Sequence, residues 1–371
     1  MRIALVVERF DPAGGGVESA CWQIAHGLAE AGERVTVIAR EAVGSPSVSV
    51  QRIPAPTAWQ PLRVATFQVR STRALERSAF DLVHGFCRNP HVDVFHAGGG
   101  SHAEYLDRSH GAFAARLRRA SPRHALQLAL ERRIFRTDGP HIQCVSEMVR
   151  DEVATRHGVK SERLSVVPYG IDAARFAPER SDGSAFRKRL ANGAGPVWLF
   201  PGSGFQRKGL DTALQALAAC KDPQTQLWVA GRDRPRAWRA QADALGIGPR
   251  VHFLGPVDDM PGLYKAADGV LFPTRYDAFG LVLLEAAAAG CPIITSRRAG
   301  AAPLVAEASR ILEDADDVAG FAAALDELSD PIARGRLAAA GPACAARHPW
   351  SRVVSELRDL YAKVARTVDR R

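Results

Sequence analysis

Residues 272–292 read FPTRYDAFGLVLLEAAAAGCP and combine a strand end, a polar loop and a short helix. The apolar run that ends at Pro273 is typical of a buried strand, and Gly280 and Gly290 bound an apolar segment of helix length. Asp277 precedes this helix, and Glu285 lies about five residues inside it, roughly 7 Å from its amino end. The two carboxylates therefore bracket the start of one helix.

The amino end of such a helix is suited to an anion, because its first backbone N–H groups lack partners within the helix and carry partial positive charge. We expect a diphosphate to lie against Phe279, Gly280 and Leu281. Glu285 could then accept hydrogen bonds from a ribose, and Asp277 from sugar hydroxyls. On these residues alone a plainer interpretation stays open, in which Asp277 caps the helix and Glu285 is half-exposed.

Other strand-like runs recur along the chain with helix-length segments between them. They cover residues 2–7, 34–39, 197–200, 227–230, 251–254, 269–273 and 292–295. Apolar strands that alternate with helices predict parallel, doubly wound sheets. Residues 168–178, rich in Pro and Gly, separate the two series.

We therefore expect an α/β fold of two Rossmann-like, doubly wound parallel-sheet domains that face each other across a cleft. Residues 1–170 would form an acceptor-side domain, and residues 171–350 a nucleotide-sugar domain. Residues 351–371 carry apolar residues at helical spacing, and we expect them to form a helix that crosses back to the first domain.

Composition narrows the class of protein. The chain has 371 residues, 46% hydrophobic and 24% charged, which excludes a miniprotein and wholesale disorder. Its six cysteines lie far apart, as is typical of reduced thiols in the cytosol. The first apolar run meets Glu8 too early for a signal peptide, and no stretch approaches the roughly 18 apolar residues of a membrane span. We expect a cytoplasmic protein, or a peripheral one on the inner membrane.

The formal charge of +9 favours an anionic partner, and part of the excess lies in one segment. Residues 105–136 contain eight Arg against two acidic residues, with apolar residues interleaved. Such a segment can lie on an anionic bilayer, and we assign the contact to Arg116, Arg118, Arg119 and Arg123. A solvated helical face is the alternative. We expect no nucleic-acid partner, because no basic motif with interleaved aromatics stands out.

The segment 272–292 resembles the signature of the retaining GT-B glycosyltransferases of family 4. That signature is E-x7-E followed by A-x-x-x-G-x-P, and Asp277 stands here for the first Glu. Residues 202–211, with Arg207 and Lys208, are similar to the family's diphosphate-neutralising loop, and residues 14–18 to its N-terminal glycine loop. The similarity is greatest to the lipopolysaccharide-core α-1,3-glucosyltransferases.

The resemblance implies retaining transfer of a hexose, glucose, from a UDP-sugar to a hydroxyl of a lipopolysaccharide core or other lipid-linked glycan. It implies no metal and no cofactor. His102 follows a glycine run where these relatives carry an Asp. The catalytic candidates are Asp277, Glu285, Arg207, Lys208 and His102. The donor-binding candidates are Gly15, Gly16, Arg207, Lys208, Val257, Asp277, Phe279, Gly280, Leu281 and Glu285.

Three other functions are also typical of a chain with this architecture or with a glycine-rich turn. A nicotinamide dehydrogenase needs G-x-G-x-x-G, whereas residues 14–19 read GGGVES and lack the third glycine. A UDP-N-acetylglucosamine 2-epimerase shares the two-domain architecture and stays open. A bilobal sugar-binding protein without catalysis would not need the Arg207 and Lys208 pair.

Overall fold

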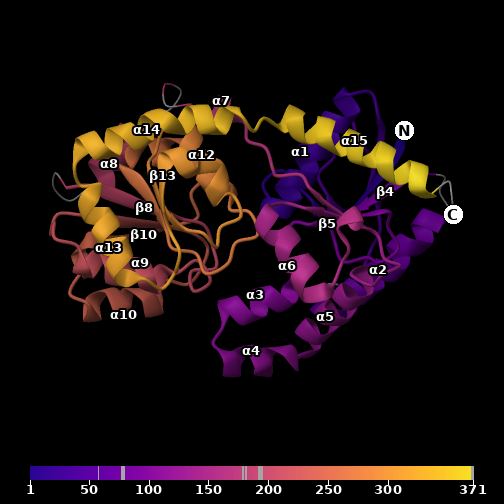
Figure 1. Cartoon of the computed structure of the whole chain (residues 1–371), viewed down its shortest axis with the longest axis horizontal. Helices are drawn as coiled ribbons and strands as arrows, with labels where there is room; N and C mark the ends of the chain where they lie inside the picture. Colours follow the sequence, from indigo (N-terminus) through magenta and orange to yellow (C-terminus); the bar gives the residue numbers. More distant parts are fainter. Residues whose placement is uncertain (57, 77–79, 178, 180–181, 191–194, 369–371) are drawn as a thin grey trace. The chain divides into compact units, whose positions relative to one another are not determined.

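The computed structural model describes residues 1–371 except 57, 77–79, 178, 180–181, 191–194 and 369–371. The chain divides into two compact units (Figure 1). Unit 1 contains Met1–Gly170 together with Trp350–Arg371, and unit 2 contains Ile171–Pro349. Among the described residues no helix combines the length and apolar character that crossing a bilayer requires.

Unit 1 is built on a seven-stranded parallel sheet of order β3-β2-β1-β4-β5-β6-β7. The strands are β1 Arg2–Phe10, β2 Arg34–Ala42, β3 Ser49–Arg52, β4 Leu82–Gly85, β5 Val94–Ala97, β6 His141–Cys144 and β7 Leu164–Val166. The helices are α1 Gly16–Glu30, α2 Gln60–Glu76, α3 His102–Ser109, α4 Ala112–Arg119, α5 Pro122–Ile134, α6 Glu147–His157 and α15 Trp350–Val368, with the 3-10 turn η1 Ser161–Arg163.

Unit 2 is built on a six-stranded parallel sheet of order β10-β9-β8-β11-β12-β13. The strands are β8 Val197–Pro201, β9 Gln226–Ala230, β10 Val251–Gly255, β11 Gly269–Phe272, β12 Ile293–Ser296 and β13 Ser309–Leu312. The helices are α7 Ala173–Phe176, α8 Ser184–Leu190, α9 Leu210–Ala219, α10 Arg236–Ala244, α11 Met260–Ala266, α12 Leu281–Ala288, α13 Val318–Glu327 and α14 Pro331–Ala346, with the 3-10 turns η3 Gly248–Arg250 and η4 Ala302–Ala308.

Both sheets are doubly wound, as the sequence predicts. Strands β8, β9, β11 and β12 are buried along their whole length, which explains why they are nearly continuous apolar runs. In unit 2 the strand order reverses between β8 and β11, and in unit 1 between β1 and β4. Ligands of doubly wound sheets bind beyond the carboxyl ends of the strands at such a reversal. The loops after β8 and β11 are therefore the expected ligand-binding loops of unit 2.

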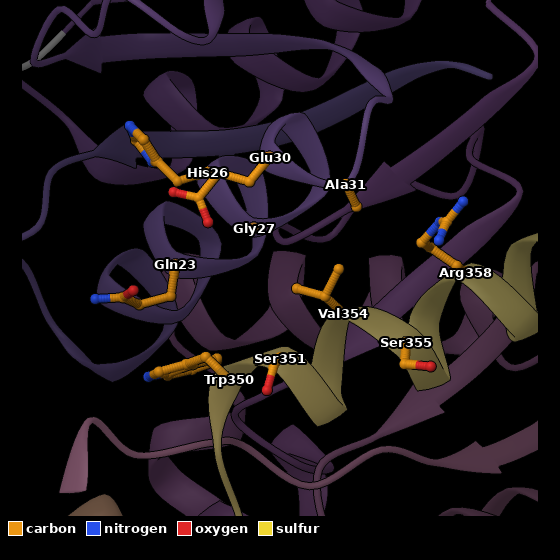
Figure 2. Close-up of a pocket in the computed structure, with 10 residues that line it drawn as sticks. All are labelled: Gln23, His26, Gly27, Glu30, Ala31, Trp350, Ser351, Val354, Ser355 and Arg358. Carbon is orange, nitrogen blue, oxygen red and sulfur yellow. The ribbon is translucent and has the colours of Figure 1, made fainter. Parts of the chain in front are cut away.

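The C-terminal helix α15 belongs to the core of unit 1, where it lies alongside α1 (Figure 1). Its buried face consists of Val353, Val354, Leu357, Leu360, Tyr361 and Val364. Val354 packs against Gly27 of α1 so closely that a Cβ at Gly27 would lie 2.5 Å from the Val354 Cγ2 atom. These two helices line a groove of about 420 Å³. Figure 2 shows the side chains that border it. Close packing, rather than a ligand, accounts for this glycine.

We predict that Leu357→Ala lowers the free energy of unfolding of unit 1 by about 2–5 kcal/mol, because the fully buried side chain leaves a cavity. Ser355→Ala, on the exposed face of the same helix, is the matched control. Chemical denaturation followed by circular dichroism measures both. Equal stability of the two variants would show that α15 does not contribute to this core.

Candidate functional site

The loop between β11 and α12 carries Asp277, and α12 carries Glu285, both near the reversal point of the unit 2 sheet. α12 begins at Leu281, and Glu285 is its fifth residue. Gly280 immediately precedes the helix with φ of 87°, a left-handed conformation that favours glycine. The loop is anchored because the Asp277 N–H donates to the Arg298 carbonyl at 3.0 Å. Asp277 and the amino end of α12 are thus held in fixed relation.

The loop between β8 and α9 carries the two predicted cations. Its backbone is fastened by Asp233, which follows β9. The Asp233 carboxylate accepts hydrogen bonds from Gly204 N at 3.0 Å and from Phe205 N at 2.8 Å. The chain then turns so that Arg207 and Lys208 lie just before α9. Asp233 therefore fixes the loop that positions both cations.

The two loops meet through ion pairs. Arg207 Nη1 lies 3.4 Å from Asp277 Oδ2 and also donates to the Tyr276 carbonyl. Lys208 Nζ lies 3.8 Å from the same Asp277 oxygen. Lys208 is only 7% exposed, and its ammonium lies 4.9 Å from the centre of the Phe272 ring. The structure thus brings together three of the predicted catalytic residues.

Burial and nearby charges act on Lys208 in opposite directions. Loss of water lowers the pKa of its ammonium, and the Arg207 charge acts in the same direction. The carboxylates of Asp277, Glu285 and Asp233 raise that pKa. Lys208 and Arg207 are hydrogen-bond donors of the kind that a diphosphate accepts from, while the three carboxylates offset part of their charge.

Glu285 lies half-buried beside this cluster. Its Oε2 atom accepts a hydrogen bond of 2.9 Å from the Tyr264 hydroxyl of α11. Burial raises the pKa of the Glu285 carboxyl, while the hydrogen bond from Tyr264 and the charges of Arg175 and Lys208 lower it. Burial is the largest of these contributions, so the pKa of Glu285 is raised overall, and the Tyr264 hydrogen bond and the two charges limit the rise.

Arg275 connects the β8–α9 loop with the β11–α12 loop, a role that was not predicted from the sequence. Its guanidinium donates to both oxygens of Asp211 at 2.8 Å and to Asp316 Oδ1 at 2.8 Å. It also donates to the Gln206 carbonyl at 2.7 Å, and the Arg275 backbone N–H donates to the Arg207 carbonyl at 2.9 Å. Arg275 therefore ties the cation-bearing loop to the carboxylate-bearing one.

The remaining predicted donor residues lie at element boundaries. Phe279 belongs to the β11–α12 loop, and Val257 lies half-buried between β10 and α11 in unit 2. Gly15 immediately precedes α1 in unit 1, and Gly16 is its first residue. Both glycines follow β1, at the strand-order reversal of the unit 1 sheet.

His102 begins α3 in unit 1, and its ring is engaged by another histidine. His102 Nε2 lies 2.9 Å from His124 Nδ1, and the two rings stack with centroids 5.1 Å apart. The buried Glu131 carboxylate accepts from the His102 backbone N–H and from the Ser101 hydroxyl at 3.2 Å. Burial, with the charge of Arg88 as the next contribution, lowers the pKa of His102 to about 3. His102 is therefore neutral near pH 7.

The basic segment 105–136 forms three short helices rather than one continuous amphipathic helix. Several of its apolar residues belong to the core, namely Leu106, Leu130, Ile134 and Phe135. On α4, in contrast, Phe113 is 83% exposed and Leu117 is 68% exposed, one helical turn apart. Arg116 and Arg118 are exposed on the same helix, and Arg119 pairs with Asp107 at 2.6 Å. The large exposed apolar residues of the segment therefore lie on α4 beside two exposed Arg residues, whereas Arg123, the fourth predicted contact, is exposed on α5.

Two buried histidines lie at the strand ends of unit 1. His84 Nδ1 bonds to the Tyr361 hydroxyl of α15 at 2.7 Å. His96 Nε2 bonds to the Tyr169 hydroxyl at 2.6 Å, and its Nδ1 bonds to Gln143. Burial lowers the pKa of His96 to about 4. These side chains hold the sheet to α15 and to the chain segment that leaves unit 1.

Comparison with known proteins identifies the family. Residues 14–175 match the family model described as Glycosyltransferase Family 4, and residues 195–330 match the model described as Glycosyl transferases group 1. A probable transglycosylase of Burkholderia thailandensis is 30% identical over 363 residues, which cover 95% of this chain and 94% of that protein. The chain belongs to the group 1, family 4 glycosyltransferases. It is an enzyme of a retaining family.

Other proteins show similarity over most of the chain. The lipopolysaccharide glucosyltransferase WaaG of Escherichia coli (strain K12) is 29% identical over 318 residues, covering 83% of this chain and 84% of that protein. A crystal structure of WaaG superposes with a TM-score of 0.83 at 25% identity, covering 97% of this chain and 99% of the other. Anabaena Alr3699/HepE, solved with UDP and glucose, gives a TM-score of 0.74 at 20% identity, covering 98% and 99%. The predicted GT-B fold is confirmed.

We predict that His96 contributes to the change of the free energy of unfolding with pH. Its pKa in the folded chain, about 4, lies below the ordinary 6.5, so unfolding takes up protons between these values. The contribution to stability is complete above pH 6.5 and falls as the pH decreases toward 4. His96→Gln should flatten this part of the curve in denaturation experiments. The exposed His91→Gln is the control, and an unchanged slope in His96→Gln would contradict the assignment.

Proposed function

We propose that this glycosyltransferase moves a hexose, glucose, from a UDP-sugar to a hydroxyl of a lipopolysaccharide core or other lipid-linked glycan. The proposal rests on the ion pairs of Asp277 with Arg207 and Lys208. These pairs lie near the amino end of α12, where the strand order of the sheet reverses. The cations match a diphosphate, and the acidic groups match sugar hydroxyls. Two similar proteins support UDP and glucose: WaaG of Escherichia coli is a lipopolysaccharide glucosyltransferase, and the structure of Anabaena HepE holds UDP and glucose.

Each side chain then has a distinct role. Arg207 and Lys208 stabilise the negative charge that builds on the departing UDP, which is the main electrostatic contribution the protein makes. Asp277 accepts hydrogen bonds from hydroxyls of the donor sugar, and Glu285 from those of the ribose. Phe279, Gly280 and Leu281 would place backbone N–H groups against the diphosphate. The β8–α9 loop therefore stabilises charge, while the β11–α12 loop and α12 recognise the hydroxyls of the donor.

Retention follows from attack on the face from which UDP leaves. The bond between the anomeric carbon and the phosphate oxygen breaks, and a bond from the acceptor oxygen forms on the same face. The acceptor proton passes to the departing phosphate oxygen. No carboxylate is required as a nucleophile, so the enzyme acts through alignment and charge stabilisation.

The acceptor part of the proposal rests on α4. Exposed Phe113 and Leu117, with Arg116 and Arg118 beside them, combine an apolar face with positive charge. A helix of this kind lies in the interface of an anionic bilayer, and each basic residue near the surface contributes about 1 kcal/mol. A peripheral position on the cytoplasmic face of the inner membrane would bring the enzyme to a lipid-linked glycan.

We predict that Lys208→Ala lowers glucosyl transfer at least about a hundredfold with the fold intact, because one preorganised charge contact to the leaving group is lost. Transfer from UDP-glucose to a truncated lipopolysaccharide core measures the rate, and circular dichroism checks the fold. Lys221→Ala, at an exposed lysine of the same unit, is the control. Wild-type turnover in Lys208→Ala would refute the proposed role.

We predict that replacing Arg116, Arg118 and Arg119 together by Gln reduces sedimentation with anionic phospholipid vesicles, and that salt weakens wild-type binding in the same assay. Replacement of the exposed Arg234, Arg236 and Arg336 of unit 2 removes the same charge and is the matched control. If both triple variants bind vesicles equally, α4 is not the membrane contact.

A further inference from the structure

We propose that Tyr264 is a positioning residue, which holds the Glu285 carboxylate in the orientation that recognises the ribose hydroxyls of the donor nucleotide. The inference rests on the proposed function, because it takes Glu285 as the ribose-binding group. It adds a second residue to that recognition, from a helix that carries no predicted catalytic residue. Tyr264 is buried and donates one directed hydrogen bond to Glu285, whose carboxylate has charged neighbours.

Tyr264 is held rigidly by its surroundings. It lies on α11 and is only 1% exposed, and its ring packs edge-on against Phe176 with centroids 6.0 Å apart. The start of α11 is fixed by Asp259, whose side chain accepts from Gly262 N at 2.9 Å. The Tyr264 hydroxyl is therefore presented to α12 by a side chain with little freedom to move.

The hydroxyl contacts one oxygen of Glu285. It donates to Oε2 at 2.9 Å, and the Val282 carbonyl lies 3.4 Å from the same hydroxyl. Burial together with the negative charge of Glu285 raises the pKa of Tyr264 well above its ordinary value, so the phenol keeps its proton and remains a donor. Because Tyr264 engages Oε2, it fixes the rotation of the carboxylate and leaves Oε1 for a ribose hydroxyl.

The surroundings of Glu285 explain why such a donor matters. Burial alone would favour the protonated carboxyl, and a protonated carboxyl is a poorer acceptor for ribose hydroxyls. The positive charges of Arg175 and Lys208 support ionisation but do not fix direction. The hydrogen bond from Tyr264 fixes the orientation of the Glu285 carboxylate. A site built to bond a substrate hydroxyl discriminates strongly against an analogue without it, provided that its polar group is held in place.

Isothermal titration calorimetry with UDP, 2′-deoxy-UDP and 3′-deoxy-UDP tests this role. For Tyr264→Phe we expect UDP affinity to fall about tenfold, as for loss of a hydrogen bond that orients a charged group. For at least one deoxy analogue the variant and the wild type should bind almost equally, because the hydroxyl that Glu285 would accept is absent. A structural defect would instead weaken all three nucleotides alike.

Tyr361→Phe is the matched control, since Tyr361 is also buried and its hydroxyl is also hydrogen-bonded, but in unit 1. It should bind UDP as the wild type does. Glu285→Ala tests the ribose-binding role of Glu285 separately from the positioning role of Tyr264. If Glu285→Ala binds UDP normally, the ribose assignment itself fails. If Glu285→Ala weakens UDP binding while Tyr264→Phe does not, or if Tyr264→Phe weakens all three nucleotides equally, the positioning role of Tyr264 is overturned.

Discussion

The interaction on which this site depends is the ion pairing of Asp277 with Arg207 and Lys208. A cation as buried as Lys208 is costly unless an opposite charge lies beside it, and Asp277 provides that charge at 3.8 Å. The same pairing holds the β8–α9 loop against the β11–α12 loop. A diphosphate entering between the cations and α12 would find positive charge already in place. The protein thus meets the cost of ordering these groups during folding rather than during catalysis.

Several residues outside the reaction make this arrangement possible. Asp233 fixes the backbone of the cation-bearing loop, and Arg275 ties that loop to the carboxylate-bearing one by donating to the Gln206 and Arg207 carbonyls. Asp211 and Asp316 in turn hold the Arg275 guanidinium. The sheet itself places both loops at the reversal between β8 and β11. The site is therefore the product of one topological feature and a small set of polar contacts, all within unit 2.

The fold and the central carboxylate pattern were predictable because they depend on local sequence. Apolar strands of a doubly wound sheet are visible as runs, and Asp277 and Glu285 are related through one helix start. Tyr264, Asp233 and the partners of Arg275 were missed because each contact joins distant positions with no shared pattern. The apolar residues of segment 105–136 show the same limit. Periodicity marks them as apolar, but only the packing separates buried Leu130 from exposed Phe113.

The most direct test of the central claim is a crystal structure of this chain with UDP bound. We expect the diphosphate to lie within hydrogen-bonding distance of Arg207 and Lys208 at the amino end of α12, with the ribose against Glu285. A nucleotide bound elsewhere, with Lys208 still paired only with Asp277, would contradict it.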